Sequence, residues 1–212
     1  MKTVAIIDCA VSEPTLYCYN RLIQQGVPAS YHSANLFGLR TLSNLDDFYA
    51  AIILGSYTHV HENLPWHKDL TEWSVNALNN NLPILGICFG HQLIASAFGS
   101  TVVKNPHGNR EGLVEVSTAK DNFSIFYSHE YHVSDLSNDF TEMGRSKDLP
   151  HDIIQHKTLP FVGIQGHPEG SERFNQEMLN SPLSPEASSL CQKDGIRFIK
   201  DFLNDYAKEA LI

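Results

Sequence analysis

A cysteine flanked by two glycines is the first candidate for chemistry in this chain. Residues 86–92 read Gly-Ile-Cys-Phe-Gly-His-Gln, and they lie between the apolar runs 82–85 and 93–98. A strand, a tight turn and a helix in that order place Cys88 at the apex of the turn, where the flanking glycines let the backbone bend sharply. The thiol is then exposed near the positive end of the helix dipole, which favours the reactive thiolate. We therefore predict that Cys88 is a nucleophile.

The spacing of this motif separates Cys88 from the other three cysteines. The frame Gly-x-Cys-x-Gly-x-Gln arises by chance on the order of once per thousand chains, given ordinary residue frequencies. Cys9, Cys18 and Cys191 stand in no such frame, and we interpret them as small buried hydrophobes. The alternative for the motif itself is that its two glycines only permit close packing of the strand against the helix.

A second segment supplies the groups that a thiol nucleophile needs. Residues 161–169 read Phe-Val-Gly-Ile-Gln-Gly-His-Pro-Glu, which indicates a short strand running into a turn. A cysteine nucleophile requires a base that takes and returns a proton, and the base requires an acceptor that fixes its tautomer. His167 and Glu169 are two residues apart, so on an extended backbone both project to the same face, and Pro168 helps to hold that spacing.

Together the two motifs resemble those of the class I, or triad-type, glutamine amidotransferases. That family carries Gly-x-Cys-x-Gly-x-Gln and, later in the chain, Gln-x-His-Pro-Glu, and both stand intact here at residues 86–92 and 165–169. The resemblance covers residues 1 to about 170 in order and spacing. It implies that Cys88 is the nucleophile, that His167 is the general base and acid, and that Glu169 orients His167.

Hydrolysis of an amide also requires donors that stabilise negative charge on the carbonyl oxygen, and backbone N–H groups usually provide them. The N–H of Phe89, the residue after the nucleophile, is one candidate. Gly55 is the other, because it ends a predicted parallel strand and ligands bind at the carboxyl ends of such strands. The family supplies a donor from a glycine-rich turn at this place. Here the turn reads Leu-Gly-Ser-Tyr where many relatives carry two glycines and a proline, so a tight turn without a catalytic part remains an alternative.

The resemblance further implies which residues bind the substrate. Gln92 lies one helical turn beyond Cys88, and the family uses this position in substrate binding. Ser128 and His129 match a Ser-His segment whose backbone contacts the α-amino and α-carboxylate groups of glutamine. His129, Glu130 and His132 fit none of the usual zinc spacings, so we expect no metal and no cofactor.

Composition sets the remaining limits. The chain has 212 residues, of which 42% are hydrophobic, and we expect a single domain over residues 1–212. Its net charge of −9 argues against a nucleic-acid partner. No apolar run is long enough to span a bilayer, and the N-terminus is too short and too soon acidic for a signal peptide. Four scattered cysteines, one of them a working thiol, point to the cytoplasm.

The order of the apolar runs predicts an α/β fold. Runs at 4–7, 28–33, 50–54 and 82–85 alternate with helical patterns at 13–25 and 65–80, which implies a parallel sheet covered on both faces. Later short segments predict antiparallel or edge strands, at 113–116, 123–127, 140–144, 152–156 and 161–165. Residues 180–186 predict a loop, and an apolar stripe over 196–206 predicts a final helix. The family resemblance implies a mostly parallel central sheet in a flavodoxin-like three-layer architecture, with a smaller antiparallel sheet.

Three functions are compatible with these residues. The first is a free-standing glutamine amidotransferase that releases ammonia from glutamine, with a synthetase partner protein as the possible acceptor. The second is a γ-glutamyl peptidase that acts on a peptide such as glutathione. Gly166, the small residue before the histidine, resembles free-standing relatives of that kind. The third is a non-catalytic regulatory module, against which the intact Cys, His and Glu set argues.

Overall fold

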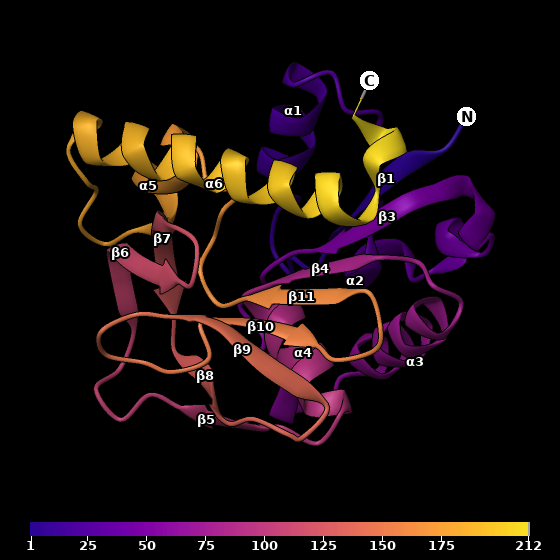
Figure 1. Cartoon of the computed structure of the whole chain (residues 1–212), viewed down its shortest axis with the longest axis horizontal. Helices are drawn as coiled ribbons and strands as arrows, with labels where there is room; N and C mark the ends of the chain where they lie inside the picture. The colour runs from indigo at the N-terminus through magenta and orange to yellow at the C-terminus, as the bar shows by residue number, and fades with distance from the viewer. Residues whose placement is uncertain (212) are drawn as a thin grey trace.

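A nine-stranded mixed sheet runs through the centre of the computed structural model, which describes residues 1–211 (Figure 1). The strand order is β2-β1-β3-β4-β11-β10-β9-β6-β7. Pairing is parallel from β2 to β11 and antiparallel from β11 to β7. The strands are β1 (Thr3–Asp8), β2 (Ala29–Ser33), β3 (Phe48–Ile53), β4 (Ile84–Ile87), β6 (Arg110–Thr118), β7 (Asn122–His129), β9 (Phe140–Arg145), β10 (Ile153–His156) and β11 (Phe161–Ile164).

A separate antiparallel sheet of two strands, β5 (Thr101–Lys104) and β8 (Tyr131–Asp135), lies beside the main one. The α-helices are α1 (Tyr17–Gln24), α2 (Ala34–Phe37), α3 (Pro65–Asn79), α4 (Phe89–Ala97), α5 (Glu172–Met178) and α6 (Pro185–Tyr206). Short 3₁₀ turns occupy Arg40–Leu42, Leu45–Asp47, Val60–Glu62 and Lys208–Ala210. No helix within residues 1–211 combines the length and the apolar character needed to cross a membrane.

Side chains that alternate along each strand fill two cores, one on either face of the sheet. Val4 and Ile6 of β1 pack in the same cluster as Leu22 of α1 and Phe202 of α6. The neighbours of Val4 and Ile6 along β1 point the other way, into a cluster with residues of α3 and α4. Figure 1 shows α1 and α6 above the sheet and α3 and α4 below it. The predicted α/β fold, with helices on both faces and a small antiparallel sheet, is confirmed.

The first helix begins later than the sequence pattern predicts. The pattern extends helix from residue 13, whereas α1 begins at Tyr17. The cause is Asp8 at the end of β1, whose fully buried carboxylate accepts hydrogen bonds from the N–H groups of Ala10 at 2.9 Å and Thr15 at 2.7 Å. These bonds fix residues 10–15 as a loop over the end of the strand, because the carboxylate competes with helical pairing for those donors.

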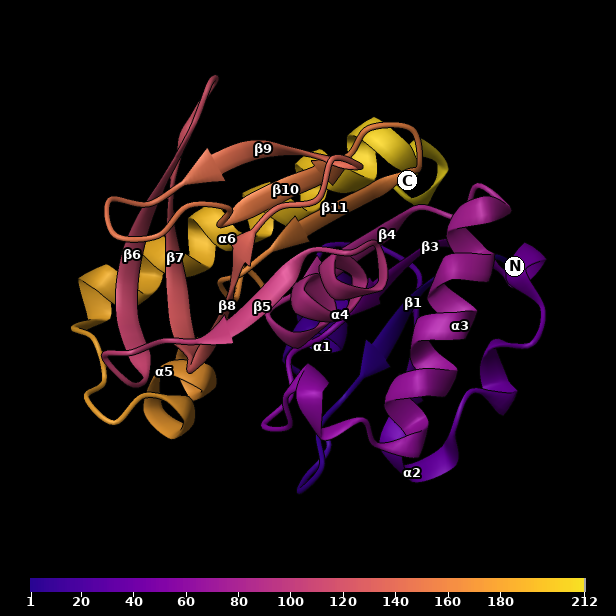
Figure 2. The same cartoon turned by 90° about the horizontal axis from the view of Figure 1, so that it is seen from below.

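The segment at 161–165 also differs from the expectation of an antiparallel or edge strand. As β11 it lies in the middle of the sheet, parallel to β4 on one side and antiparallel to β10 on the other. It therefore joins the parallel half of the sheet to the antiparallel half (Figure 2). Its carboxyl end lies beside the carboxyl end of β4, since Ile164 pairs with Ile87. This register brings the two candidate catalytic segments to one edge of the sheet.

Candidate active site

Cys88 is the single residue between the end of β4 and the start of α4. Its backbone has φ 49° and ψ −102°, a conformation that costs a non-glycine residue on the order of 1–3 kcal/mol. Hydrogen bonds on both sides hold it there, from Cys88 N–H to the carbonyl of Ile164 at 2.8 Å and from Gln92 N–H to the carbonyl of Cys88 at 3.0 Å. Cys88 is only 6% exposed, so the expectation of an exposed thiol is wrong, although the residue lines a cavity.

The two flanking glycines are required by close approach, and the sharp bend is made by Cys88 itself. A Cβ on Gly86 would lie 2.8 Å from the backbone of Gly90, and a Cβ on Gly90 would lie 2.5 Å from the carbonyl oxygen of Ile53 in β3. Neither glycine has a positive φ. Our sequence-based expectation that the glycines supply the bend is therefore wrong in its detail. Their absent side chains let the start of α4 sit directly against β4 and β3.

His167 and Glu169 lie next to each other, as their spacing predicts. His167 Nδ1 is 2.8 Å from Glu169 Oε1, and both side chains are buried. Burial alone lowers the pKa of His167, but the negative charge of Glu169 and the thiol group of Cys88 outweigh burial and raise that pKa well above its ordinary value of 6.5. Because Nδ1 faces Glu169, the other ring nitrogen, Nε2, is left for proton exchange.

The turn that carries these two residues is held from both neighbouring helices. The guanidinium group of Arg21 in α1 donates to the carbonyl oxygens of Pro168 at 3.1 Å and Gly170 at 2.6 Å. On the other side, α6 passes so close at Gly195 that a Cβ there would lie 2.8 Å from the carbonyl carbon of Pro168. The N–H of His167 donates to the carbonyl of Phe126 in β7 at 2.7 Å. These contacts fix the imidazole relative to the sheet.

Gly55, the first glycine after β3, leaves the space in which His167 and Cys88 meet. A Cβ on Gly55 would lie 2.8 Å from Cε1 of His167 and 3.5 Å from Cβ of Cys88. All three residues line the same cavity, together with Glu169. Phe89 begins α4, so its N–H belongs to the first helical turn, whose donors have no partner inside the helix.

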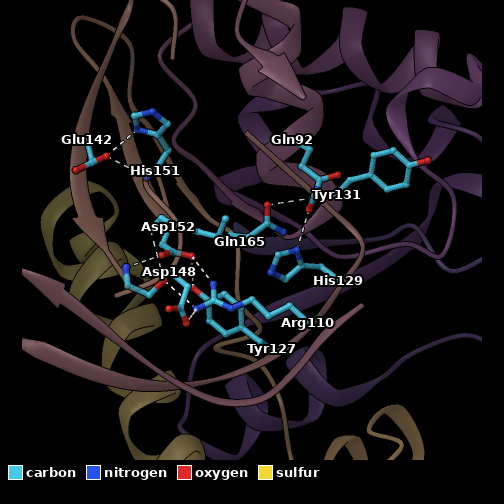
Figure 3. A network of polar contacts seen from close by, with 12 residues as sticks. Gln92, Arg110, Tyr127, His129, Tyr131, Glu142, Asp148, His151, Asp152 and Gln165 are labelled. Atoms are coloured by element: carbon cyan, nitrogen blue, oxygen red, sulfur yellow. Dashed lines mark hydrogen bonds and ion pairs between the residues drawn. The ribbon is translucent and has the colours of Figure 1, made fainter. Parts of the chain in front are cut away.

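A second cavity also borders Cys88. Its lining includes Cys88, Gln92, Ser128 and His129, which are the predicted nucleophile and the three residues that the sequence predicts for substrate binding. Gln92 Nε2 donates to the carbonyl of Tyr131 at 2.7 Å and to Oε1 of Gln165 at 3.2 Å (Figure 3). The nearby His129 is buried, and burial lowers its pKa to about 3, so that it is neutral. Ser128 lines both cavities.

A polar network that includes Arg110, Tyr127 and Asp152 lies beside His129 (Figure 3). The hydroxyl of Tyr127 donates to Oδ1 of Asp152 at 2.7 Å, and Arg110 lies over the Tyr127 ring at 5.0 Å and 3.7 Å from the same carboxylate oxygen. The ring of Tyr127 fills the position that a side chain on Gly166 would take. The absence of a side chain on Gly166, before His167, therefore leaves room for the large ring of Tyr127 on β7.

The glutamine amidotransferase class-I family model matches residues 15–183 of the chain. The chain belongs to this family. Among its relatives, the carbamoyl phosphate synthase arginine-specific small chain of Neurospora crassa is 30% identical over 171 residues, which are 78% of this chain and 36% of that protein. The glutamine-hydrolyzing GMP synthase subunit of Thermococcus kodakarensis is 37% identical over 98 residues, which are 42% of this chain and 52% of that protein. The chain thus spans between about a third and a half of these relatives' lengths.

Solved structures of other family members share the fold. A glutamine amidotransferase from Thermotoga maritima has a TM-score of 0.77 at 19% identity, with 99% of this chain and 98% of that chain covered. A glutamine amidotransferase from Methylobacillus flagellatus has a TM-score of 0.70 at 21% identity, with 100% of this chain and 92% of that chain covered.

Several residues around Cys88 in this class I amidotransferase were not singled out from the sequence. They line the His167 side of the cavity and come from the loop before α1, from α1, from the loop after β3 and from α5: Thr15, Tyr17, Tyr57, Phe174 and Met178. None belongs to a motif, so no sequence signal identifies them. Within residues 1–211, no group of three or more His, Cys, Asp or Glu side chains is placed to hold a metal ion.

Proposed function

We propose that this chain hydrolyses the γ-amide of glutamine to glutamate and ammonia through a γ-glutamyl thioester on Cys88. One observation carries the proposal: the 2.8 Å contact of His167 Nδ1 with Glu169, in a cavity that Cys88 also lines. It leaves Nε2 of the same imidazole as the group that exchanges protons with the nucleophile and with the leaving amine. Glu169 keeps the tautomer and orientation of His167 and stabilises its protonated form.

The proposed reaction has two halves. The thiolate of Cys88 adds to the γ-carbonyl carbon, and the N–H groups of Phe89 and Gly55 stabilise the oxygen anion that forms. The carbon–nitrogen bond then breaks as His167 gives its proton to the departing amine, which leaves as ammonia. In the second half His167 accepts a proton from water, the resulting hydroxide attacks the thioester, and the carbon–sulfur bond breaks to restore the thiolate.

The second cavity is the proposed site for the α-amino and α-carboxylate groups of the substrate. Cys88 lines it and His167 does not, and its polar lining includes Gln92 and the segment from Ser128 to Tyr131. The bonds from the Gln92 amide to Tyr131 and Gln165 hold its side chain in one orientation. A fixed amide and nearby backbone groups suit a small zwitterion, because every charge of the ligand then meets an oriented partner.

Two relatives of this chain bear names that describe one part of a larger enzyme, the carbamoyl phosphate synthase small chain and the GMP synthase subunit. By extension, we propose that the ammonia released here passes to a separate synthetase protein in the cytoplasm.

A second candidate function is γ-glutamyl peptidase activity, with the same thioester and a peptide as the leaving amine. Two observations favour it. Gly166 precedes His167 where dedicated synthetase-linked domains commonly carry a bulky aromatic residue, and Tyr127 fills that space instead. The cavity beside His167 also extends past the triad to Tyr17 and Met178, which gives a leaving group larger than ammonia room to bind.

The test is to incubate the purified chain with glutamine and, separately, with glutathione, and to measure ammonia and free glutamate. Ammonia from glutamine supports the amidotransferase, whereas peptide cleavage with little ammonia favours the peptidase. Cys88→Ala is expected to abolish both reactions. Cys9→Ala is the matched control, because Cys9 is a free, buried cysteine that packs in the core on the opposite face of the sheet from the core that contains Cys88. Activity that survives in Cys88→Ala would refute the thioester.

A further inference from the structure

The cavity beside His167 is built mainly from aromatic and apolar side chains. Phe174 of α5 packs on the catalytic imidazole, with 4.8 Å between ring centroids and 40° between ring planes. Tyr17 at the start of α1 meets the edge of Phe174 at 6.2 Å. Across the opening, the hydroxyl of Tyr57 lies 3.2 Å from the sulfur of Met178. The leaving side of the nucleophile is therefore enclosed by two tyrosines, a phenylalanine and a methionine.

The positions of the two cavities assign this apolar chamber to the leaving group. The nitrogen that departs must lie beside His167, because that residue protonates it. His167 and Glu169 line only this cavity, while Gln92 and His129 line only the other one. Any substituent on the departing nitrogen therefore extends toward Tyr17 and Met178, while Tyr57 lines both cavities.

Ammonia gains little binding energy from an apolar chamber. It is small and strongly hydrated, and an apolar chamber offers it few hydrogen bonds. Aromatic side chains and methionine instead contribute binding energy to flat, apolar groups through buried area and ring contacts. Tyr57 is 69% exposed in the described structure, so it retains surface that a ligand in the chamber would cover.

We propose that the preferred substrates of this site are γ-glutamyl amides whose leaving amine carries an aromatic or similarly bulky apolar group. The inference rests on the proposed function, because it uses the same thioester. The sulfur–carbon bond forms as the amide carbon–nitrogen bond breaks, His167 gives its proton to the aromatic amine, and water then releases glutamate from Cys88. No oxidant or reductant takes part.

The outer end of the chamber carries one cation, Arg173, together with the carboxylates of Glu13 and Glu177. A neighbouring cavity shares Tyr17, Tyr57 and Met178 and continues to Arg173 and Glu177. Arg173 is paired with Glu177 at 2.7 Å, and its side chain is 70% exposed. Of an aromatic amine and an aromatic amino acid as leaving groups, only the amino acid has a carboxylate for Arg173.

The test compares γ-L-glutamyl-benzylamide, γ-L-glutamyl-methylamide, γ-L-glutamyl-L-phenylalanine and L-glutamine, with glutamate release as the readout. We expect kcat/KM for the benzylamide to exceed that for the methylamide by about tenfold or more, the range that a few methylenes of apolar contact provide. Tyr57→Ala should reduce that ratio by about tenfold. Phe37→Ala is the matched control: Phe37 is 66% exposed, in α2, and outside the chamber. This control should leave the ratio unchanged.

The outcomes separate this inference from the proposed function. If the chain hydrolyses glutamine and the methylamide, but kcat/KM for the benzylamide is no higher than for the methylamide, the inference is overturned and the proposed function stands. If the chain releases glutamate from none of the four compounds, both are overturned. A further preference for the phenylalanine compound that Arg173→Gln removes supports the proposal and assigns an amino acid as the leaving group. Equal kcat/KM values for the two aromatic compounds support the proposal and assign a simple amine as the leaving group.

Discussion

Gly90→Ala tests how the fold holds the nucleophile, because two physical effects predict opposite results for it. Alanine in place of glycine inside a helix ordinarily stabilises a protein by about 0.8–1.0 kcal/mol. Gly90 lies in α4 and has no positive φ, so nothing in its own backbone opposes alanine. The added Cβ would, however, lie 2.5 Å from the carbonyl oxygen of Ile53 and 2.9 Å from its Cβ.

The expected magnitude follows from those distances. Non-bonded carbon atoms rest at roughly 3.5–4.0 Å, so α4 must withdraw from β3 by about 1 Å. Overpacking of this kind costs about 1–3 kcal/mol, which exceeds the gain in helix propensity. We therefore expect the free energy of unfolding to fall by up to about 2 kcal/mol, the difference between the two effects. A shift of that size at Cys88 should also reduce kcat/KM by about 10²-fold, because Cys88 immediately precedes the helix.

Urea unfolding and glutaminase kinetics together provide the assay. Gly26→Ala is the control, since Gly26 has a positive φ of 78° and nothing within 4 Å of its added Cβ. That variant should lose about 1–2 kcal/mol through backbone strain and keep its activity. A Gly90→Ala variant that is as stable as the parent and fully active would show that the close contact between α4 and β3 does not position Cys88.

Two further predictions concern titratable groups. Glu169→Gln removes the charge that raises the pKa of His167, so His167 should lose its proton at lower pH. The kcat/KM of the Glu169→Gln variant should fall by about 10²–10⁴-fold, and the alkaline limb of its pH profile should move to lower pH. An alkaline limb that stays in place would contradict this role of Glu169. Burial lowers the pKa values of His91 and His129 from 6.5 to about 3, so below pH 6.5 the unfolded chain binds more protons than the folded one. Stability should therefore decrease from pH 7 to pH 5, by up to about 1.4 kcal/mol per pH unit for each histidine. His91→Leu should reduce that slope in urea titrations, and an unchanged slope would count against the buried neutral form.

The parts of the fold that follow from local patterns were predicted from the sequence. Strands β1, β3 and β4 are buried on both faces. Each therefore appears in the sequence as an uninterrupted apolar run, which can be recognised without knowing its distant partners. The start of α1 was not predicted, because it depends on hydrogen bonds that a buried Asp8 makes to residues after it. The short strands β5 and β8 also escaped prediction, since four or five partly exposed residues carry little periodicity.

The candidate site, like the fold, contains residues that the sequence predicts and residues that it does not. Cys88, His167 and Glu169 lie in motifs that the sequence alone identifies. The spacing of His167 and Glu169 predicts that their side chains lie close together, and in the structure they do. Arg21, which clamps the carbonyls around Glu169, is a single residue in an unremarkable helix. Likewise, Tyr57 reaches the chamber only through tertiary packing. Residues of this kind become visible only when the chain is folded, because their partners lie far away in the sequence.

The most direct test of the central claim is to detect the covalent intermediate on the sulfur of Cys88. The intact chain is mixed with glutamine, quenched rapidly in acid, digested and analysed by mass spectrometry. We expect one γ-glutamyl group on the peptide that contains Cys88, absent from Cys88→Ala and removed on longer incubation. Release of ammonia from glutamine by an enzyme that never carries a glutamyl group on that peptide would contradict the thioester mechanism.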